Sequence, residues 1–155
     1  MMLARGILFL QWNALGKASR VAALEKNFEN FGLARNSPAT KELCLVIGRA
    51  EQLPFADEAF ELIIALFSVP RLCRTEENVS RTIDEMCRAT KPGGEIWLAP
   101  LEHPYRPNLN EWIRVKLASI SGNRSYLLLE GSIDKEITGI PGSLGEFKYC
   151  RIKKL

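Results

Sequence analysis

The sequence predicts an α/β fold built on a doubly wound sheet. Short apolar segments typical of buried strands alternate with segments of helical periodicity, which is the order of such a sheet. The chain has 155 residues, 46% of them hydrophobic and 25% charged, enough for one sizeable hydrophobic core in an ordinary globular protein. We therefore expect a single domain over residues 1–155, without repeats, low-complexity tracts or linkers.

The N-terminal half contains four candidate strands and one candidate helix. The strands are short and apolar, as strands buried on both faces of a sheet are. They cover Ile7–Leu10, Arg20–Glu25, Leu43–Ile47 and Phe60–Phe67. Between the second and third strands, apolar residues recur at roughly helical spacing until a proline interrupts the pattern. These residues are Phe28, Phe31, Leu33 and Ala34.

In the C-terminal half of the chain, the sequence predicts two helices and three strands. Thr75 is a suitable N-cap for a helix over Thr75–Thr90, because acidic residues follow it and Arg88 stands near the other end of the dipole. A second amphipathic helix opens at Pro107 and carries Leu109, Trp112, Ile113, Leu117 and Ile120 on one face. Lys91-Pro92-Gly93-Gly94 has the signature of a type II turn. The remaining strands are expected at Glu95–Ala99, Tyr126–Leu129 and Phe147–Ile152.

Charge and hydropathy narrow the classes of function. The net charge of +3 and the pI near 8.7 fall well short of a dedicated nucleic-acid binder. The basic residues of the tail are expected to lie exposed to solvent at the end of a strand, and the alternative is a patch that contacts phosphate groups. They are Lys148, Arg151, Lys153 and Lys154. The apolar stretch Gly6–Leu10 is shorter than a spanning helix or a signal-peptide core. We expect a cytoplasmic protein that binds neither nucleic acid nor membrane.

The cysteines predict neither a zinc site nor a disulfide framework. They are widely separated, no C-x-x-C pair occurs, and the chain has one histidine. Cys44 and Cys87 lie among apolar neighbours and are expected in the core, which suits a reducing cytoplasm. Trp97 and Trp112 are likewise expected to be core residues.

Ligands of doubly wound sheets bind beyond the carboxyl ends of the strands. Two segments near these ends resemble the class I S-adenosylmethionine-dependent methyltransferases. Residues 48–63 read GRAEQLPFADEAFELI, where the family typically reads G-D-A-x-x-L-P-F-x-D-x-x-F-D-x-V. Residues 86–96, MCRATKPGGEI, resemble the family's E-x-x-R-V-L-K-P-G-G-x-L. The resemblance is good over 43–101 and plausible over 20–42. It implies a Rossmann-like sheet of the class I methyltransferase type and S-adenosyl-L-methionine as cofactor.

The same resemblance implies cofactor contacts at three strand ends. In the family, an acid at the end of the second strand accepts hydrogen bonds from both ribose hydroxyls of the cofactor. Glu25 stands at this position. The alternative interpretation of Glu25 is an exposed glutamate at a strand end, without a ligand. Arg49 replaces the family's aspartate after the third strand, so the contact with the adenine amino group is lost. The backbone contact from Ala50 or Glu51 depends on the chain path and stays available.

Phe67 and Ser68, after the fourth strand, would flank the adenosyl or methionine moiety under the same resemblance. His103 lies beyond the fifth strand, in a loop with two prolines, and is expected to be structural or solvent-facing instead of a general base. Methyl transfer from a sulfonium depends on positioning and on exclusion of water, so no catalytic side chain is assigned.

The family's glycine-rich turn, roughly D-x-G-x-G-x-G, is not recognisable after the first strand. Residues 7–17 contain one glycine and no acid, with Trp12 where small residues belong. Too few residues separate Gly16 from Glu25 for a helix, so we expect a truncated first β-α unit or a fragment. Two hypotheses follow: a methyltransferase for a small-molecule acceptor, or a catalytically inactive methyltransferase-like binding or partner module. An exposed edge or apolar face would favour a homo-oligomer.

Overall fold

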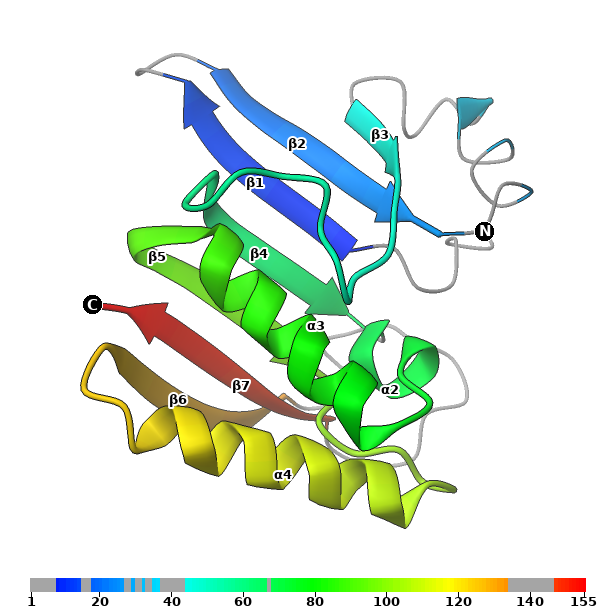
Figure 1. Ribbon diagram of the computed structural model, residues 1–155, viewed down its shortest axis with the longest axis vertical. Helices are drawn as coiled ribbons and strands as arrows, with labels where there is room; N and C mark the ends of the chain where they lie inside the picture. Colours follow the sequence, from blue (N-terminus) through cyan, green and yellow to red (C-terminus); the bar gives the residue numbers. More distant parts are fainter. Residues whose placement is uncertain are drawn as a thin grey trace.

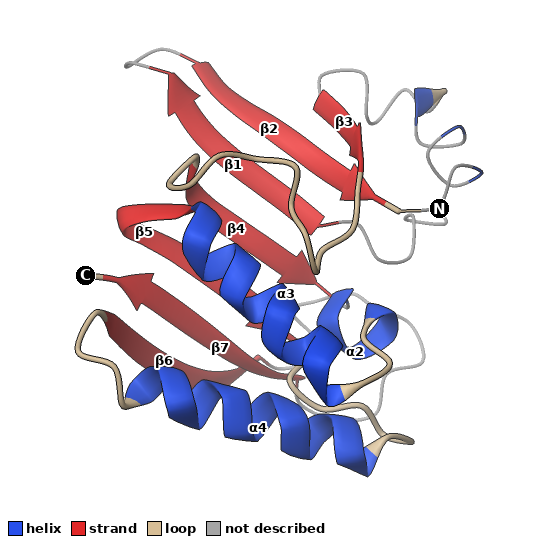
Figure 2. Ribbon diagram, in the orientation of Figure 1, coloured by secondary structure: helices blue, strands red, loops and turns tan. Residues whose placement is uncertain are grey.

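The computed structural model describes residues 8–14, 18–26, 29, 32, 35–36, 44–66, 68–133 and 147–155. Within these ranges seven strands form one sheet, in the order β3-β2-β1-β4-β5-β7-β6. Helices lie in front of the sheet in the view of Figure 1, and Figure 2 separates them from the strands by colour. In chain order the elements are β1 (Leu8–Ala14), β2 (Ala18–Glu25), β3 (Cys44–Ile47), β4 (Phe60–Leu66), α2 (Ser68–Leu72), α3 (Glu76–Ala89), β5 (Thr90–Ala99), α4 (Pro107–Ser121), β6 (Tyr126–Ile133) and β7 (Phe147–Lys154).

The fold is a Rossmann-like doubly wound sheet in its strand order and in the common direction of β2, β3, β4 and β5, whereas β1 runs the opposite way. β2 is parallel to β3, and β4 is parallel to β5. β1 is antiparallel to both β2 and β4, so β2 and β4 run in the same direction. β7 is antiparallel to its neighbours β5 and β6. The carboxyl ends of β2, β3, β4 and β5 therefore meet at one edge of the sheet, called here the carboxyl edge (Figure 1).

The first unit of the fold differs from the sequence-based expectation. The strand predicted at Ile7–Leu10 continues to Ala14, so Gln11 and Trp12 belong to a strand and not to a loop. Ala14 pairs with Ala18, and Leu8 pairs with Leu24. β1 and β2 thus pair directly, without an intervening helix, and this confirms that the first β-α unit is truncated. Residues 15–17 lie outside the described residues, as do Phe28, Phe31, Leu33 and Ala34 of the expected helix.

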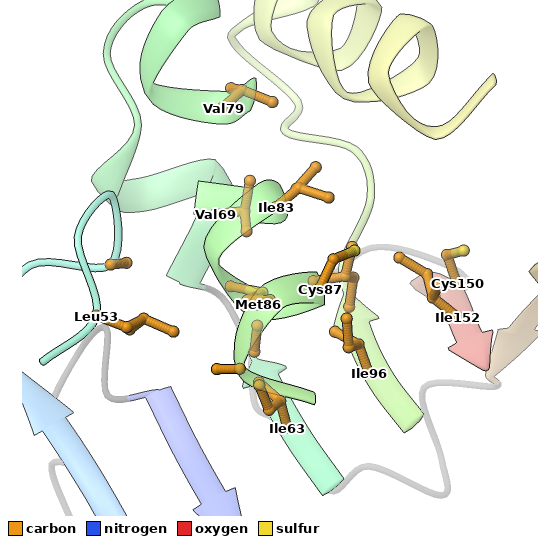
Figure 3. Packing of buried hydrophobic residues seen from close by; sticks show 14 of the residues in the cluster. Leu53, Ile63, Val69, Val79, Ile83, Met86, Cys87, Ile96, Cys150 and Ile152 are labelled. Carbon is orange, nitrogen blue, oxygen red and sulfur yellow. The ribbon is translucent and has the colours of Figure 1, made fainter. Parts of the chain in front are cut away.

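The core lies between the sheet and the helices α3 and α4. Figure 3 shows side chains of α3 packed against residues of β4, β5 and β7. Ile83 and Met86 of α3 are fully buried, as is Ile63 of β4. Each such side chain contributes about 1.5–3 kcal/mol through burial. The expected apolar face of α4 is confirmed, because Leu109, Ile113, Leu117 and Ile120 are buried and Trp112 is half-buried against the core.

Local signals at both ends of α3 act as the sequence predicts. The Thr75 hydroxyl accepts a 3.2 Å hydrogen bond from the Asn78 N–H and caps the helix. The turn predicted after α3 lies inside β5, where Gly93 has the left-handed φ of 78° that a type II turn requires. The register between β4 and β5 shifts here, from Phe60↔Thr90 to Leu62↔Glu95. The turn therefore forms a bulge that lets β5 begin directly after the helix.

Two predicted core residues are exposed instead. Trp97 is 37% exposed because Ile96 and Leu98 face the helices, and the period of two in a strand turns Trp97 to the opposite face. There its ring stacks on Tyr149, with centroids 6.0 Å apart and an interplanar angle of 9°. Cys44 is exposed at the start of β3, which forms an edge of the sheet. Apolar neighbours in sequence do not reveal which residues stand at an edge.

The basic tail also differs from a simple solvated strand end. The Lys154 side chain is 17% exposed, and its Nζ donates hydrogen bonds to the backbone oxygens of Thr90 (2.9 Å) and Cys87 (3.3 Å). These carbonyls belong to the C-terminal end of α3, where a positive charge is favoured by the helix dipole. The last strand therefore fixes the end of α3 as well as pairing with β5 and β6. Among the described helices, none is long and apolar enough to cross a membrane.

Candidate functional site at the carboxyl edge

The carboxyl edge gathers the segments that the sequence selects. Glu25 at the end of β2 pairs with Ile47 at the end of β3, and Leu66 at the end of β4 pairs with Ala99 in β5. Glu25 therefore stands at the strand end that the family resemblance requires. The segments that follow β3, β4 and β5 begin at this same edge, so they are available to one ligand.

The segment after β3 forms a tight turn. The backbone N–H of Gln52 donates a 3.1 Å hydrogen bond to the carbonyl of Arg49, and the two residues form an isolated bridge. Ala50 is 5% exposed inside this turn. The Arg49 side chain is 71% exposed, and its guanidinium lies 3.7 Å from the Glu51 carboxylate. The turn thus holds Arg49, Ala50 and Glu51 at the end of β3.

A cavity of about 200 Å³ opens between this turn and the first turns of α3. Its walls are polar and contain as many arginines as glutamates: Arg49, Glu51, Gln52, Glu77, Asn78 and Arg81. Arg81 pairs with Glu77 at 2.7 Å, as Arg49 pairs with Glu51. Because the charges balance, the cavity suits an uncharged polar group with several hydrogen-bonding atoms better than a phosphate.

A pair of residues on α3 holds the loop between β3 and β4. The Glu85 carboxylate accepts a 2.8 Å hydrogen bond from the backbone N–H of Leu53. Arg88 donates to the carbonyls of Leu53 (3.2 Å) and Phe55 (2.9 Å) and to the Asp57 carboxylate (2.7 Å). Glu85 and Arg88 also bond to each other at 2.8 Å. We call Glu85 and Arg88 the loop clamp, because together they fix the path of residues 53–57.

The loop clamp is an electrostatic unit. The hydrogen bond from Arg88 lowers the pKa of Glu85, and the Leu53 N–H acts in the same direction against the effect of burial. The hydrogen bonds to Glu85 and Asp57 raise the pKa of Arg88. The clamp explains why the two family-like segments occur together, since one supplies the loop and the other the residues that grip it. Sequence analysis missed Glu85, although it stands at the first letter of the family's E-x-x-R.

A second arginine organises the segment after β4. Ser68, the first residue of α2, is 1% exposed. Arg106, the N-cap residue of α4, donates 2.9 Å hydrogen bonds to the carbonyls of Pro70 and Cys73. The loops that follow β4 and β5 are therefore tied together at the carboxyl edge. No sequence signal marked Arg106, because its partners are backbone carbonyls. Phe67 lies outside the described residues.

His103 takes part in a local turn. Its Nδ1 accepts a 3.2 Å hydrogen bond from the backbone N–H of Tyr105. Its own backbone N–H and carbonyl both bond to the Asn110 side chain, at 2.7 Å and 3.1 Å. These contacts agree with the expectation of a structural histidine.

The orientation of β1 tests whether a class I methyltransferase cofactor fits. β1 runs against β2 and β4, so its carboxyl end at Ala14 lies at the edge opposite Glu25. Ala14 and its paired residue Ala18 both lie at this opposite edge, away from the carboxyl ends of β3 and β4. Among the described residues, those around the polar cavity beside Arg49 and Glu51 would hold the nucleoside half of such a cofactor. They do not supply a glycine-rich turn for its methionine end.

Comparisons with known proteins agree with this fold. The model of the methyltransferase domain family matches residues 4–98. The demethylmenaquinone methyltransferase of Renibacterium salmoninarum is 32% identical over 101 residues, which cover 59% of this chain and 41% of that protein. The malonyl-[acyl-carrier protein] O-methyltransferase of Methylococcus capsulatus is 38% identical over 64 residues, covering 41% of this chain and 22% of that protein. The matched region spans less than half the length of these curated relatives.

Solved structures share the architecture at low sequence identity. A possible histamine N-methyltransferase from Thermotoga maritima, described as S-adenosylmethionine-dependent, has a TM-score of 0.56 and 16% identity, covering 85% of this chain and 72% of that chain. TrmN from Thermus thermophilus has a TM-score of 0.60 and 19% identity, covering 91% of this chain and 38% of that chain. Because the family model matches more than half of the sequence, this chain belongs to the class I S-adenosylmethionine-dependent methyltransferase family.

Proposed function

We propose that this domain binds S-adenosyl-L-methionine at the carboxyl edge and transfers its methyl group to a small-molecule acceptor. The observation that carries the proposal is the turn of residues 49–52 at this edge, which lines a polar cavity together with the first turns of α3. Family membership supports the cofactor. Relatives named for demethylmenaquinone and for a malonyl group on acyl-carrier protein support a metabolic acceptor.

In this proposal, the residues at the strand ends position the nucleoside. The Glu25 carboxylate accepts hydrogen bonds from the ribose hydroxyls, and the backbone at Ala50 and Glu51 meets the adenine ring. Arg49 has no acceptor to offer an amino group and contributes through its pairing with Glu51. Phe67 and Ser68 flank the remainder of the cofactor. When bound, S-adenosylmethionine supplies a methyl group on a positively charged sulfur; the domain contributes orientation and exclusion of water.

A second function has its own supporting observation. The direction of β1 leaves the carboxyl edge without a glycine-rich turn from the segment that follows this strand. A domain that holds only the nucleoside half of S-adenosylmethionine binds this ligand but does not align its methyl group for attack by an acceptor. In this second proposal the domain is a catalytically inactive, methyltransferase-like binding or partner module. The free thiols of all four cysteines suit a reducing cytoplasm under either proposal.

Calorimetric titration with S-adenosylmethionine and S-adenosylhomocysteine tests the first proposal. We expect saturable binding that Glu25→Ala weakens by about tenfold or more, which corresponds to loss of one or two hydrogen bonds. Glu61→Ala is the matched control, because Glu61 lies at the start of β4, at the opposite edge, and its side chain is 43% exposed. Absence of binding at millimolar ligand would overturn the proposal. Binding without methyl transfer to any acceptor in a screen would favour the inactive module.

A further inference from the structure

β6 forms one margin of the sheet and exposes two leucines there. Leu127 and Leu129 are each 47% exposed, and they share one face of the sheet because residues two positions apart in a strand do so. In the part of the chain that the structure describes, no strand pairs with the outer edge of β6. Its sequence, YLLLEGSI, contains one charged residue, Glu130, and neither lysine nor proline. Lysine and proline are residues that commonly protect an edge from pairing.

Leu129 begins a row of side chains across the sheet, and Leu127 lies beside Lys153 of β7 on the same face. Leu129 pairs with Arg151 of β7, and Arg151 pairs with Trp97 of β5. The row lies on the face away from α3 and α4, and no described helix covers it (Figure 2). The charge in the row is already partnered, since Arg151 bonds to Glu95 at 2.6 Å and lies over the Trp97 ring at 5.7 Å. At the β6 edge the exposed leucines therefore lie beside two cations of β7: Arg151, whose charge is partnered, and Lys153.

We propose that a second copy of this chain pairs with β6 in antiparallel orientation, about a two-fold axis at Leu128 perpendicular to the sheet. A two-fold axis makes the contact closed and self-complementary. In this register, Leu127 stands directly opposite Leu129 of the partner subunit, and each exposed leucine is covered by its counterpart. Glu130 stands opposite Tyr126 of the partner subunit, so no like charges meet. The two sheets become one, with the helices of both copies on the same side.

Neighbouring registers are worse for stated reasons. An axis at Leu129 places Leu128, which is half-buried, opposite Glu130 of the partner subunit. An axis at Leu127 places exposed Leu129 opposite Ser125 of the partner subunit. In both cases an apolar side chain faces a polar one across the new pair of strands. The exposed leucines thus favour this register of two identical strands over its neighbours.

Sedimentation across a concentration series tests the partner. We expect the native chain to dimerise reversibly, and Leu129→Lys to raise the dimer dissociation constant by about tenfold or more, because lysine blocks edge pairing. Ile47→Lys is the matched control: Ile47 is 37% exposed on β3, the opposite edge strand, and this variant should dimerise like the native chain. A native chain that stays monomeric throughout, or a dimer that only Ile47→Lys disrupts, would overturn the proposal.

Cysteine cross-linking tests the register. In a Cys44→Ser background the remaining native cysteines are buried, so the introduced cysteine is the one accessible for cross-linking. Leu128→Cys should give a disulfide-linked dimer on mild oxidation, since a residue on the axis stands opposite its own copy, with Cβ atoms about 4.5–5.5 Å apart. Ser132→Cys, on the same strand and exposed, should not cross-link, because its two copies lie far apart along the strands. Cross-linking through Ser132→Cys alone would contradict the register.

Discussion

The backbone N–H of Leu53 donates a 2.8 Å hydrogen bond to the carboxylate of Glu85, across 32 positions of sequence. This bond fixes the loop after β3 to the middle of α3, and Arg88 adds bonds to two carbonyls of the same loop. The two segments that resemble the family are therefore one structural unit, in which the second holds the first in place. A change in the clamp should therefore alter the path of residues 53–57.

Replacing Arg88 tests the clamp directly. Arg88→Ala leaves the carbonyls of Leu53 and Phe55 without their donor, and we expect it to lower the free energy of unfolding by about 2–3 kcal/mol. Arg88→Lys should recover only part of the loss, because one ammonium cannot reproduce the planar fork of a guanidinium. Urea unfolding measures both. Arg114→Ala, which removes an exposed pair with Glu111 on α4, is the control and should unfold like the native protein.

The lowered pKa of Glu85 predicts how the clamp responds to pH. Its hydrogen bond from Arg88 holds the pKa below the ordinary value of 4.5 in the folded protein. The stabilisation is therefore fully present above pH 4.5 and is lost as the pH falls through the folded-state pKa. Glu85→Gln should be less stable than the native protein at neutral pH, and the difference should shrink in acid. Urea unfolding of both proteins across this range measures it; a difference independent of pH would contradict the assignment.

The bulge between α3 and β5 predicts a ranking of glycine substitutions. A Cβ on Gly94 would lie 2.9 Å from the backbone oxygens of Glu61 and Lys91, so Gly94→Ala should cost about 2–4 kcal/mol. Gly93→Ala meets no atom within 4 Å but must adopt a φ of 78°, which costs about 1–2 kcal/mol. Gly122→Ala meets only ordinary contacts and should be neutral or slightly stabilising. Thermal unfolding of the three variants checks the order.

Thiol reactivity should distinguish the cysteines. Burial raises the pKa of Cys87 to about 11 and that of Cys150 to about 12, and it raises the pKa of Cys73 as well. Thiolates react and thiols do not, so the folded protein should expose one rapidly reactive thiol, that of Cys44. A colorimetric thiol titration at mildly alkaline pH measures the number. Cys44→Ser should abolish the rapid phase, and rapid reaction of a second cysteine would contradict the packing of the core.

Much of the fold could be predicted because its signals are local. The Thr75 cap, the apolar stripe of α4 and the glycine at the left-handed position of the turn each depend on a few neighbouring residues, and the structure has all three. The resemblance over 43–101 correctly indicated the family. The cofactor contacts expected at Glu25, Arg49, Ala50, Glu51, Phe67 and Ser68 stay predictions.

What the sequence determined by itself is the type and order of most elements, since periodicity and capping are written in short stretches of chain. Only the tertiary structure decided the direction of β1, the exposure of Trp97 and Cys44, and the contacts of Arg88 and Arg106. The physical reason is that these features depend on partners far away in sequence. An apolar strand reads the same in either direction, and a backbone carbonyl that accepts an arginine leaves no mark on the sequence.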